Sequence, residues 1–220
     1  AATDPETKAQ QLIDRIAALR NSGLFAYVEP DYVVKASLTP NDSAFVNGTL
    51  WGLRNNGQLG GRPGADINAV SAWDITTGST NVIVAVIDTG IRYTHLDLAA
   101  QMWRNPGEIP GNQIDDDNNG YVDDVFGINA IDLVPAPGDP MDDIGHGTHV
   151  AGTIGAAANN GQPHVGVAWQ VQLMACKFLG ASGGLTSDAI ECIGYAARNR
   201  ARIMNNSWGG YGYSQALFDY

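Results

Sequence analysis

The sequence predicts an α/β fold, in which a doubly wound, mainly parallel β-sheet carries helices on both faces. After residue 65 the patterns alternate helix, strand, helix, strand, helix, strand along the 220-residue chain. Residues 82–87 are apolar at every position, as is typical of a strand buried on both faces of a parallel sheet. Asp88 follows this strand directly, and active sites of open parallel sheets gather where strands end.

The first 37 residues predict a small α+β piece. Leu12, Ile13, Ile16 and Leu19 recur at helical spacing within a helix predicted over 5–20. Residues 24–34 predict strands that are interrupted near 29–31. Two elements of this size bury too little apolar surface to fold alone, so we expect them to need a partner surface.

The remaining chain predicts a turn-rich linker and strap over 38–64, followed by an α/β domain over 65–220. A helix is predicted over 66–75, with Asp66 as its N-cap. A loop-rich insertion covers 105–143. The later elements are a helix at 146–158, a strand at 171–178, a helix at 187–198 and a strand at 202–207.

Charge and composition exclude several classes of partner. The net charge is −11, which disfavours nucleic acid and anionic membranes. Ten Asp and Glu residues, and no Lys or Arg, lie between 105 and 176. No apolar run approaches the roughly 20 residues that cross a bilayer. Cys176 and Cys192 lie in apolar stretches, which favours buried free thiols over the alternative, a disulfide.

Two motifs carry the chemistry. Asp88 lies in Val-Ala-Val-Ile-Asp-Thr-Gly-Ile, and His146 lies in Gly-His-Gly-Thr-His-Val-Ala-Gly. A serine hydrolase needs a nucleophile, an imidazole that takes its proton, and a carboxylate that orients the imidazole. Asp88 at a strand end and His146 at a helix start fit the last two roles.

These runs, together with His95 and Asp97, resemble the aspartate and histidine motifs of the subtilisin-like serine proteases, in their thermitase-like branch. The resemblance implies a serine endopeptidase with an Asp-His-Ser triad and a polypeptide substrate. The family's Gly-Thr-Ser nucleophile run and its oxyanion-hole Asn are absent from these 220 residues. We therefore expect that the chain is truncated before the serine motif and does not hydrolyse peptides by itself.

The same resemblance implies a substrate cleft. Residues 205–210 resemble the family's strand that pairs with substrate by strand addition, and residues 180–184 resemble the opposite wall. The candidate substrate-binding residues are Gly183, Gly184, Ser207, Trp208 and Gly209. Residues 1–37 resemble the end of the family's inhibitor-like pro-domain, which implies an intramolecular inhibitor cleaved between Lys35 and Pro40. The alternative is an N-terminal extension of the catalytic domain.

The acidic insertion predicts calcium binding. Residues 115–124 resemble the opening of an EF-hand loop, with candidate ligands Asp115, Asp117, Asn119, the backbone of Tyr121, and Asp123. The alternative is a solvated acidic loop. Family resemblance implies a second calcium site from Asp42, Asp97 and Asn160. Asn129 and Asp132 mark a third, weaker site.

Two functional readings follow from these features. The first is a secreted, bacterial, calcium-stabilised subtilisin-like endopeptidase, represented by the tail of its pro-domain and the first part of its catalytic domain. The second is a non-catalytic calcium-binding or peptide-binding module that keeps the cleft and lacks the nucleophile. The reading frame beyond Tyr220 distinguishes them, because a Gly-Thr-Ser run there favours the first.

Overall fold

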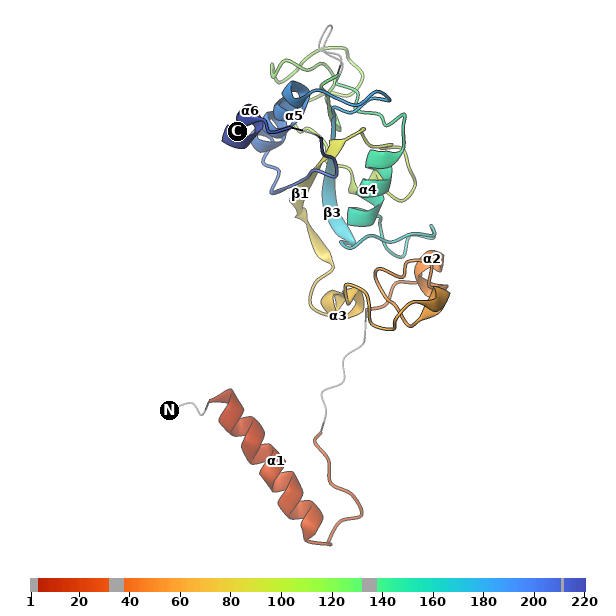
Figure 1. Ribbon diagram of the computed structural model, residues 1–220, viewed down its shortest axis with the longest axis vertical. Coiled ribbons are helices and arrows are strands. Elements are labelled where there is room, and N and C mark those ends of the chain that lie inside the picture. Colours follow the sequence, from red (N-terminus) through yellow and green to blue (C-terminus); the bar gives the residue numbers. More distant parts are fainter. Residues whose placement is uncertain (1–3, 32–37, 132–137, 211) are drawn as a thin grey trace. The chain divides into compact units, whose positions relative to one another are not determined.

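A computed structural model describes residues 4–31, 38–131, 138–210 and 212–220. The chain divides into two compact units, residues 1–37 and 38–220 (Figure 1). In the first unit, helix α1 (Pro5–Asn21) confirms the predicted helix. The described residues 24–31 contain no strand, and the rest of the predicted strand lies outside the described residues. Leu12, Ile13 and Leu19 are exposed in this unit.

The second unit is built on a four-stranded parallel sheet. Its strands are β1 (Gly78–Asp88), β2 (Gly127–Asn129), β3 (Gln170–Lys177) and β4 (Ile203–Asn205). They lie in the order β2-β3-β1-β4, and every pair is parallel. The predicted mainly parallel α/β fold is confirmed.

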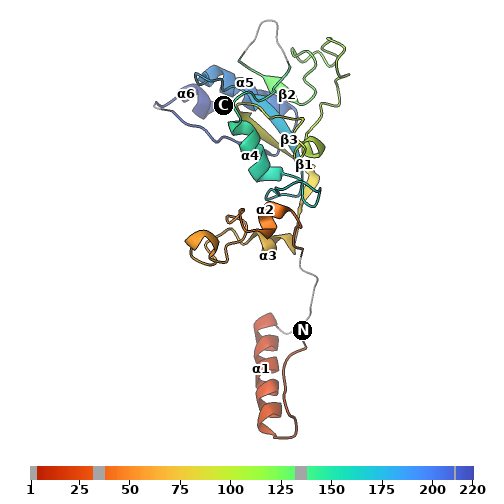
Figure 2. The same cartoon turned by 90° about the vertical axis from the view of Figure 1, so that its right-hand side faces the viewer.

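Helices cover both faces of this sheet. Ala85 and Ile87 of β1 pack in one core cluster with Tyr195 of helix α5 (Thr186–Arg198). Val86 points to the other face and packs with Ala151 of helix α4 (His146–Gly155). Figures 1 and 2 show α4 and α5 beside β1 and β3. Alternation along β1 therefore gives each helix its own apolar surface.

Strand β2 was not predicted, because it is three residues long and lies inside the loop-rich insertion. It pairs with the end of β3, and Gly127 faces Ala175 across that pair. Gly127 has φ +129°, and a Cβ there would overlap the carbonyl oxygen of Ala175. Both the backbone conformation and the close approach require glycine at this position.

Replacing Gly127 with Ala should therefore destabilise the second unit. Overpacking against Ala175 and an unfavourable φ together cost about 2–4 kcal/mol. Urea unfolding measures this change in free energy. Gly64→Ala is the matched control, because Gly64 also has a positive φ of +76° but has open space around its Cβ position. Equal stability losses in the two variants would contradict the close approach.

The segment before β1 forms its own small core. It contains helix α2 (Ser43–Val46), the 3-10 turn η1 (Gln58–Gly60) and helix α3 (Ala69–Trp73). Phe45, Leu53 and Trp73 pack together there with Val165. Helix α3 begins later than predicted, because Asp66 accepts hydrogen bonds from the backbone of Asn55 and Asn68 and Asn68 has φ +53°.

The remaining elements are short. The 3-10 turn η2 (Ala99–Gln101) precedes the insertion, and helix α6 (Gln215–Asp219) follows β4. Cys176 and Cys192 are fully buried free thiols, as predicted. In the described part of the chain, no helix has the length and apolarity needed to cross a membrane.

Candidate functional site

Asp88 and His146 meet at the carboxyl end of the sheet. Asp88 is the last residue of β1, and His146 is the first residue of α4. The Nδ1 atom of His146 lies 2.7 Å from Oδ1 of Asp88. The Asp88 side chain is fully buried, whereas that of His146 is 52% exposed. A carboxylate can only accept, so Nδ1 carries the proton and Nε2 keeps a free lone pair.

The hydrogen bond to Asp88 raises the pKa of His146, and the negative charges of Asp88 and Asp142 act in the same direction. Because the folded-state pKa is raised, the stabilising contribution is fully present below the ordinary value of 6.5. It is lost as the pH rises through the raised pKa. The contribution to folding is small, since the imidazole is half exposed and solvent screens its charge.

A second buried charge lies beside the pair. Lys177 ends β3 and is the register partner of Asp88. Its Nζ donates to the carbonyl oxygen of Thr89 at 2.9 Å and pairs with Asp143. The side-chain hydrogen bond and positive charge of Lys177 lower the pKa of Asp143. Sequence reasoning missed Lys177, because a single Lys at the end of an apolar strand carries no local signal.

The predicted substrate-binding residues follow the ends of β3 and β4. Gly180 and Gly183 form a small antiparallel bridge with two hydrogen bonds of 3.0 Å. A Cβ on Gly184 would overlap the carbonyl oxygen of Phe178. The ring of Trp208 packs edge-on against Phe178 at 4.9 Å between centroids.

Both predicted walls therefore contact one residue at the end of β3, Phe178. The Trp208 Nε1 is buried and has no hydrogen-bond partner among the described residues. Ser207 Oγ donates a hydrogen bond to Oδ1 of Asn205 at 2.8 Å. Nothing lies within 4 Å of a Cβ placed on Gly209.

The acidic insertion brings three carboxylates together. Oxygen atoms of Glu108, Asp115 and Asp117 lie within 4.8 Å of one another. Glu108 is 8% exposed, and its Oε2 has no partner among the described residues. Burial raises the pKa of Glu108, against the opposing effect of hydrogen bonds from the backbone of Asp116 and Asp117. Sequence reasoning missed Glu108, because it precedes the loop motif by several residues.

Other predicted loop ligands have different partners. The Asn119 amide donates to Asp117 and Asp124, and Tyr121 donates its backbone N–H to the Asn119 oxygen. Asp124 is fully buried, and the Tyr195 hydroxyl on α5 donates to it. Burial raises the pKa of Asp124, although three side-chain hydrogen bonds oppose that effect. Asp124 therefore anchors the insertion to α5.

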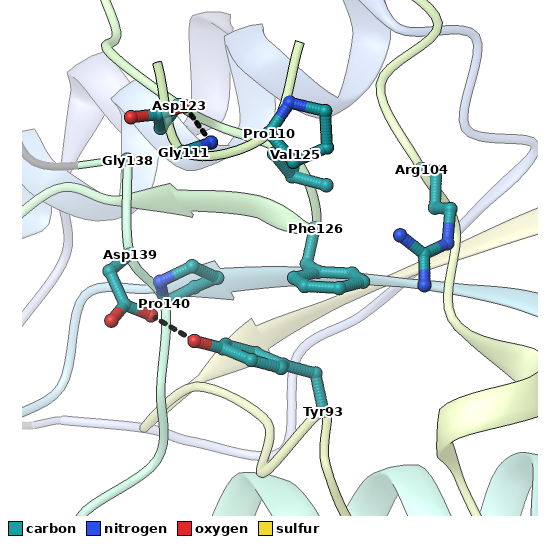
Figure 3. Close-up of a pocket in the computed structure, with 10 residues that line it drawn as sticks. All are labelled: Tyr93, Arg104, Pro110, Gly111, Asp123, Val125, Phe126, Gly138, Asp139 and Pro140. Carbon is teal, nitrogen blue, oxygen red and sulfur yellow. Dashed lines mark hydrogen bonds between the residues drawn. The ribbon is translucent and has the colours of Figure 1, made fainter. Parts of the chain in front are cut away.

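Asp123 does not join the three carboxylates. Its oxygen atoms accept hydrogen bonds from the backbone of Gly111 and Gln113 at 2.7 and 2.9 Å. Figure 3 shows Asp123 and Gly111 at the edge of a pocket of about 280 Å³, whose walls also include Tyr93 and Phe126. The two rings are stacked at 4.3 Å, and burial with the nearby Asp139 raises the pKa of Tyr93 to about 12.

The residues of the second predicted calcium site come from distant segments of the chain. Asp42 and Asp97 are each 2% exposed. Both oxygens of Asp42 accept from the Asn159 backbone N–H, and the Asn160 amide donates to Asp97 at 3.1 Å. The loop at 159–160 thus contacts both carboxylates. Of the third predicted site, Asn129 ends β2, and Asp132 lies outside the described residues.

Comparisons with known proteins identify the family of this chain. Residues 79–220 match the family model for the subtilase family. A thermophilic serine proteinase of Bacillus sp. (strain AK1) is 34% identical over 195 residues, covering 88% of this chain and 39% of that protein. An extracellular protease of Xanthomonas campestris is 32% identical over 222 residues, covering 93% of this chain and 35% of that protein.

A solved protease structure has a similar fold. A protease from Pseudoalteromonas arctica aligns with a TM-score of 0.60 at 29% identity, covering 83% of this chain and 54% of that chain. The chain thus spans 39% and 35% of the length of the two curated relatives. The family match includes both Asp88 and His146, which the fold places within hydrogen-bonding distance. The chain belongs to the subtilase family.

Proposed function

We propose that this chain supplies the Asp-His part of an Asp-His-Ser triad in a serine endopeptidase. The observation that carries the proposal is the 2.7 Å contact between a buried Asp88 and a half-exposed His146. Asp88 fixes the tautomer of His146, so the exposed Nε2 can take a proton from a serine hydroxyl and return it to the leaving amine. The substrate is a polypeptide, held between the segments around Gly183 and Trp208.

The 220 residues contain no Gly-Thr-Ser run, so we propose that the isolated chain does not turn over peptides. Catalysis that remains after loss of a triad member is several orders of magnitude slower. The missing atoms are the serine hydroxyl and the oxyanion-hole amide of the family pattern. The chain's own residues supply the base, its orientation and two walls of the cleft.

We also propose that the acidic insertion binds calcium. The donor set is all oxygen, which suits this hard cation, and the partnerless Glu108 Oε2 marks a buried charge that a cation would neutralise. The proposed ligands are Glu108, Asp115 and Asp117. Glu108 replaces Asp123, which the sequence predicted as a ligand. When bound, calcium supplies positive charge that holds the loop together.

A second calcium site is proposed at Asp42, Asp97 and Asn160. Its support is the burial of two carboxylates against one loop, at 159–160. Calcium there would link the segment before β1 to the loop after α4. The Asn160 amide would have to turn its oxygen toward the cation, because its nitrogen donates to Asp97 here.

The remaining proposals concern the whole protein. We propose that residues 1–37 are the end of a pro-domain that inhibits the cleft, supported by the exposed apolar side chains of α1, which need a partner surface. We propose secretion from a bacterium, because the similar Xanthomonas protein is named an extracellular protease. The acidic charge gives no support for nucleic acid or an anionic membrane as partner.

The reading frame beyond the codon for Tyr220 tests the enzymatic proposal. We expect a Gly-Thr-Ser run there, and hydrolysis of peptide amides by the complete gene product that an active-serine reagent abolishes. The isolated 220-residue chain, assayed beside it, should show no hydrolysis. A stop codon after Tyr220, with a stable monodisperse chain, would contradict the endopeptidase and favour a calcium-binding or peptide-binding module.

A further inference from the structure

We propose that Thr89 and Asp142 are positioning residues, which hold the loop after Asp88 against the start of α4 and thereby fix the Asp88–His146 hydrogen bond. Neither side chain contacts the His146 ring through a hydrogen bond. The hydrogen bonds of Thr89 and Asp142 form a bridge between the loop after Asp88 and the start of α4, and the catalytic importance of this bridge rests on the proposed function. The bridge itself is a property of this chain and can be measured without any nucleophile.

Asp142 is the centre of the bridge. Its Oδ1 accepts hydrogen bonds from the Thr89 hydroxyl and from the backbone N–H groups of Ile144 and Gly145, each at 2.9 Å. Its Oδ2 accepts from the backbone N–H and the hydroxyl of Thr148. Burial opposes ionisation, but the hydrogen bonds from Gly145, Thr148 and Ile144 lower the pKa of Asp142. A charged carboxylate therefore holds the first turn of α4, where the helix dipole also favours it.

Thr89 joins this centre to both members of the pair. Its backbone N–H donates to Oδ1 of Asp88 at 2.7 Å, the same oxygen that contacts His146. Its hydroxyl accepts from the Gly147 N–H at 2.8 Å and donates to Asp142. Thr89 thus orients the Asp88 carboxylate and is also hydrogen-bonded to Gly147, the residue that follows His146.

The approach of the two segments is close. A Cβ on Gly147 would overlap the carbonyl oxygen of Gly90, so backbone lies directly against backbone. Thr148 adds a further tie, since its Oγ1 accepts from the Arg92 N–H at 2.9 Å. Lys177, whose side chain is 7% exposed, supports the loop by donating to the carbonyl of Thr89. A catalytic hydrogen bond needs support of this kind to keep its geometry.

The decisive variant is Thr89→Val, which changes no charge and nearly conserves shape. Without the hydroxyl, the Gly147 N–H and the Asp142 carboxylate lose their common partner. The loop after Asp88 and the start of α4 then separate or tilt. NMR titration of His146 in the 220-residue chain measures the effect, with His146→Ala identifying its signal among the four histidines. We expect the pKa of His146 to fall toward 6.5 and the downfield Nδ1 proton signal to weaken.

Matched variants separate positioning from other causes. Thr89→Ser keeps the hydroxyl and should preserve the pKa of His146. Thr153→Val, on the same helix, removes a hydroxyl that donates to the His149 carbonyl and takes no part in the bridge, and should also preserve the pKa. Asp142→Asn should lower the pKa of His146, partly through loss of its charge, and should also weaken the downfield Nδ1 proton signal.

An unchanged pKa and Nδ1 proton signal in a folded Thr89→Val chain would overturn the proposal. If Thr89→Val does not fold by circular dichroism, the Nδ1 proton signal of Asp142→Asn decides, because loss of the Asp142 charge alone lowers the pKa of His146 without breaking the hydrogen bond from Nδ1 to Asp88. A retained downfield Nδ1 proton signal in Asp142→Asn would show that only the charge of Asp142 acts on His146, and would also overturn the proposal. Failure of the enzymatic proposal would leave each of these titrations readable, because none depends on peptide hydrolysis.

Discussion

Replacing Asp88 with Asn in the complete gene product should lower kcat for peptide hydrolysis by about 10⁴-fold, with a much smaller change in KM. The amide of Asn can donate to Nδ1 of His146, which leaves the proton on Nε2 and removes the base. Asp88 is fully buried and hydrogen-bonded to the imidazole, so no water can take over its role. Substrate contacts come from other segments, which is why KM should change little.

The control for this prediction is Asp139→Asn. Asp139 accepts hydrogen bonds from the Tyr93 hydroxyl and the Met141 N–H and does not contact the pair, so most of the rate should remain. In the wild-type protein, kcat/KM should rise as the pH passes upward through the raised pKa of His146, because the base must be neutral. Comparable activity in Asp88→Asn and Asp139→Asn would contradict the assigned role.

Removing calcium should lower the melting temperature of the 220-residue chain. A ligand present at 100 times its Kd stabilises a folded protein by about 2.7 kcal/mol. For a chain of this length, that corresponds to roughly 5–10 °C, from about 2–4 °C per kcal/mol. Scans with excess calcium and with a chelator, at equal ionic strength, measure the difference.

Variants assign the effect to the acidic insertion. Glu108→Gln and Asp117→Asn should each reduce the calcium-dependent shift, because they remove charge from the three-carboxylate group. Asp123→Asn is the matched control and should keep the shift, since Asp123 bonds to the backbone of Gly111 and Gln113. A shift that persists in the first two but disappears in Asp97→Asn would place the calcium at the second site. No shift in the wild-type chain would contradict both sites.

The sequence predicts the elements whose signal is local and regular. The apolar run before Asp88 indicates a doubly covered strand, and the structure shows Val86 and Ile87 on opposite faces of β1. The same run places Asp88 at a strand end, and a Gly-rich motif places His146 at a helix start. Their 2.7 Å contact depends on tertiary packing, which neither motif encodes alone.

What the sequence does not predict depends on contacts between distant segments. Strand β2 exists because Gly127 can approach β3 closely, and three residues give no periodicity. The folded loop brings Glu108 close to Asp115 and Asp117, although Glu108 lies outside the motif at residues 115–124. Asp142 looks like one more acid in an acidic insertion, yet its oxygens hold the start of α4 and the Thr89 hydroxyl.

The NMR titration of His146 in wild-type and Asp88→Asn chains tests the Asp88–His146 pair most directly. The pair predicts a pKa of His146 above 6.5 in the wild-type chain and a fall toward or below that value in the variant. An identical pKa of His146 in the two proteins would contradict the hydrogen-bonded pair on which the proposed catalysis rests.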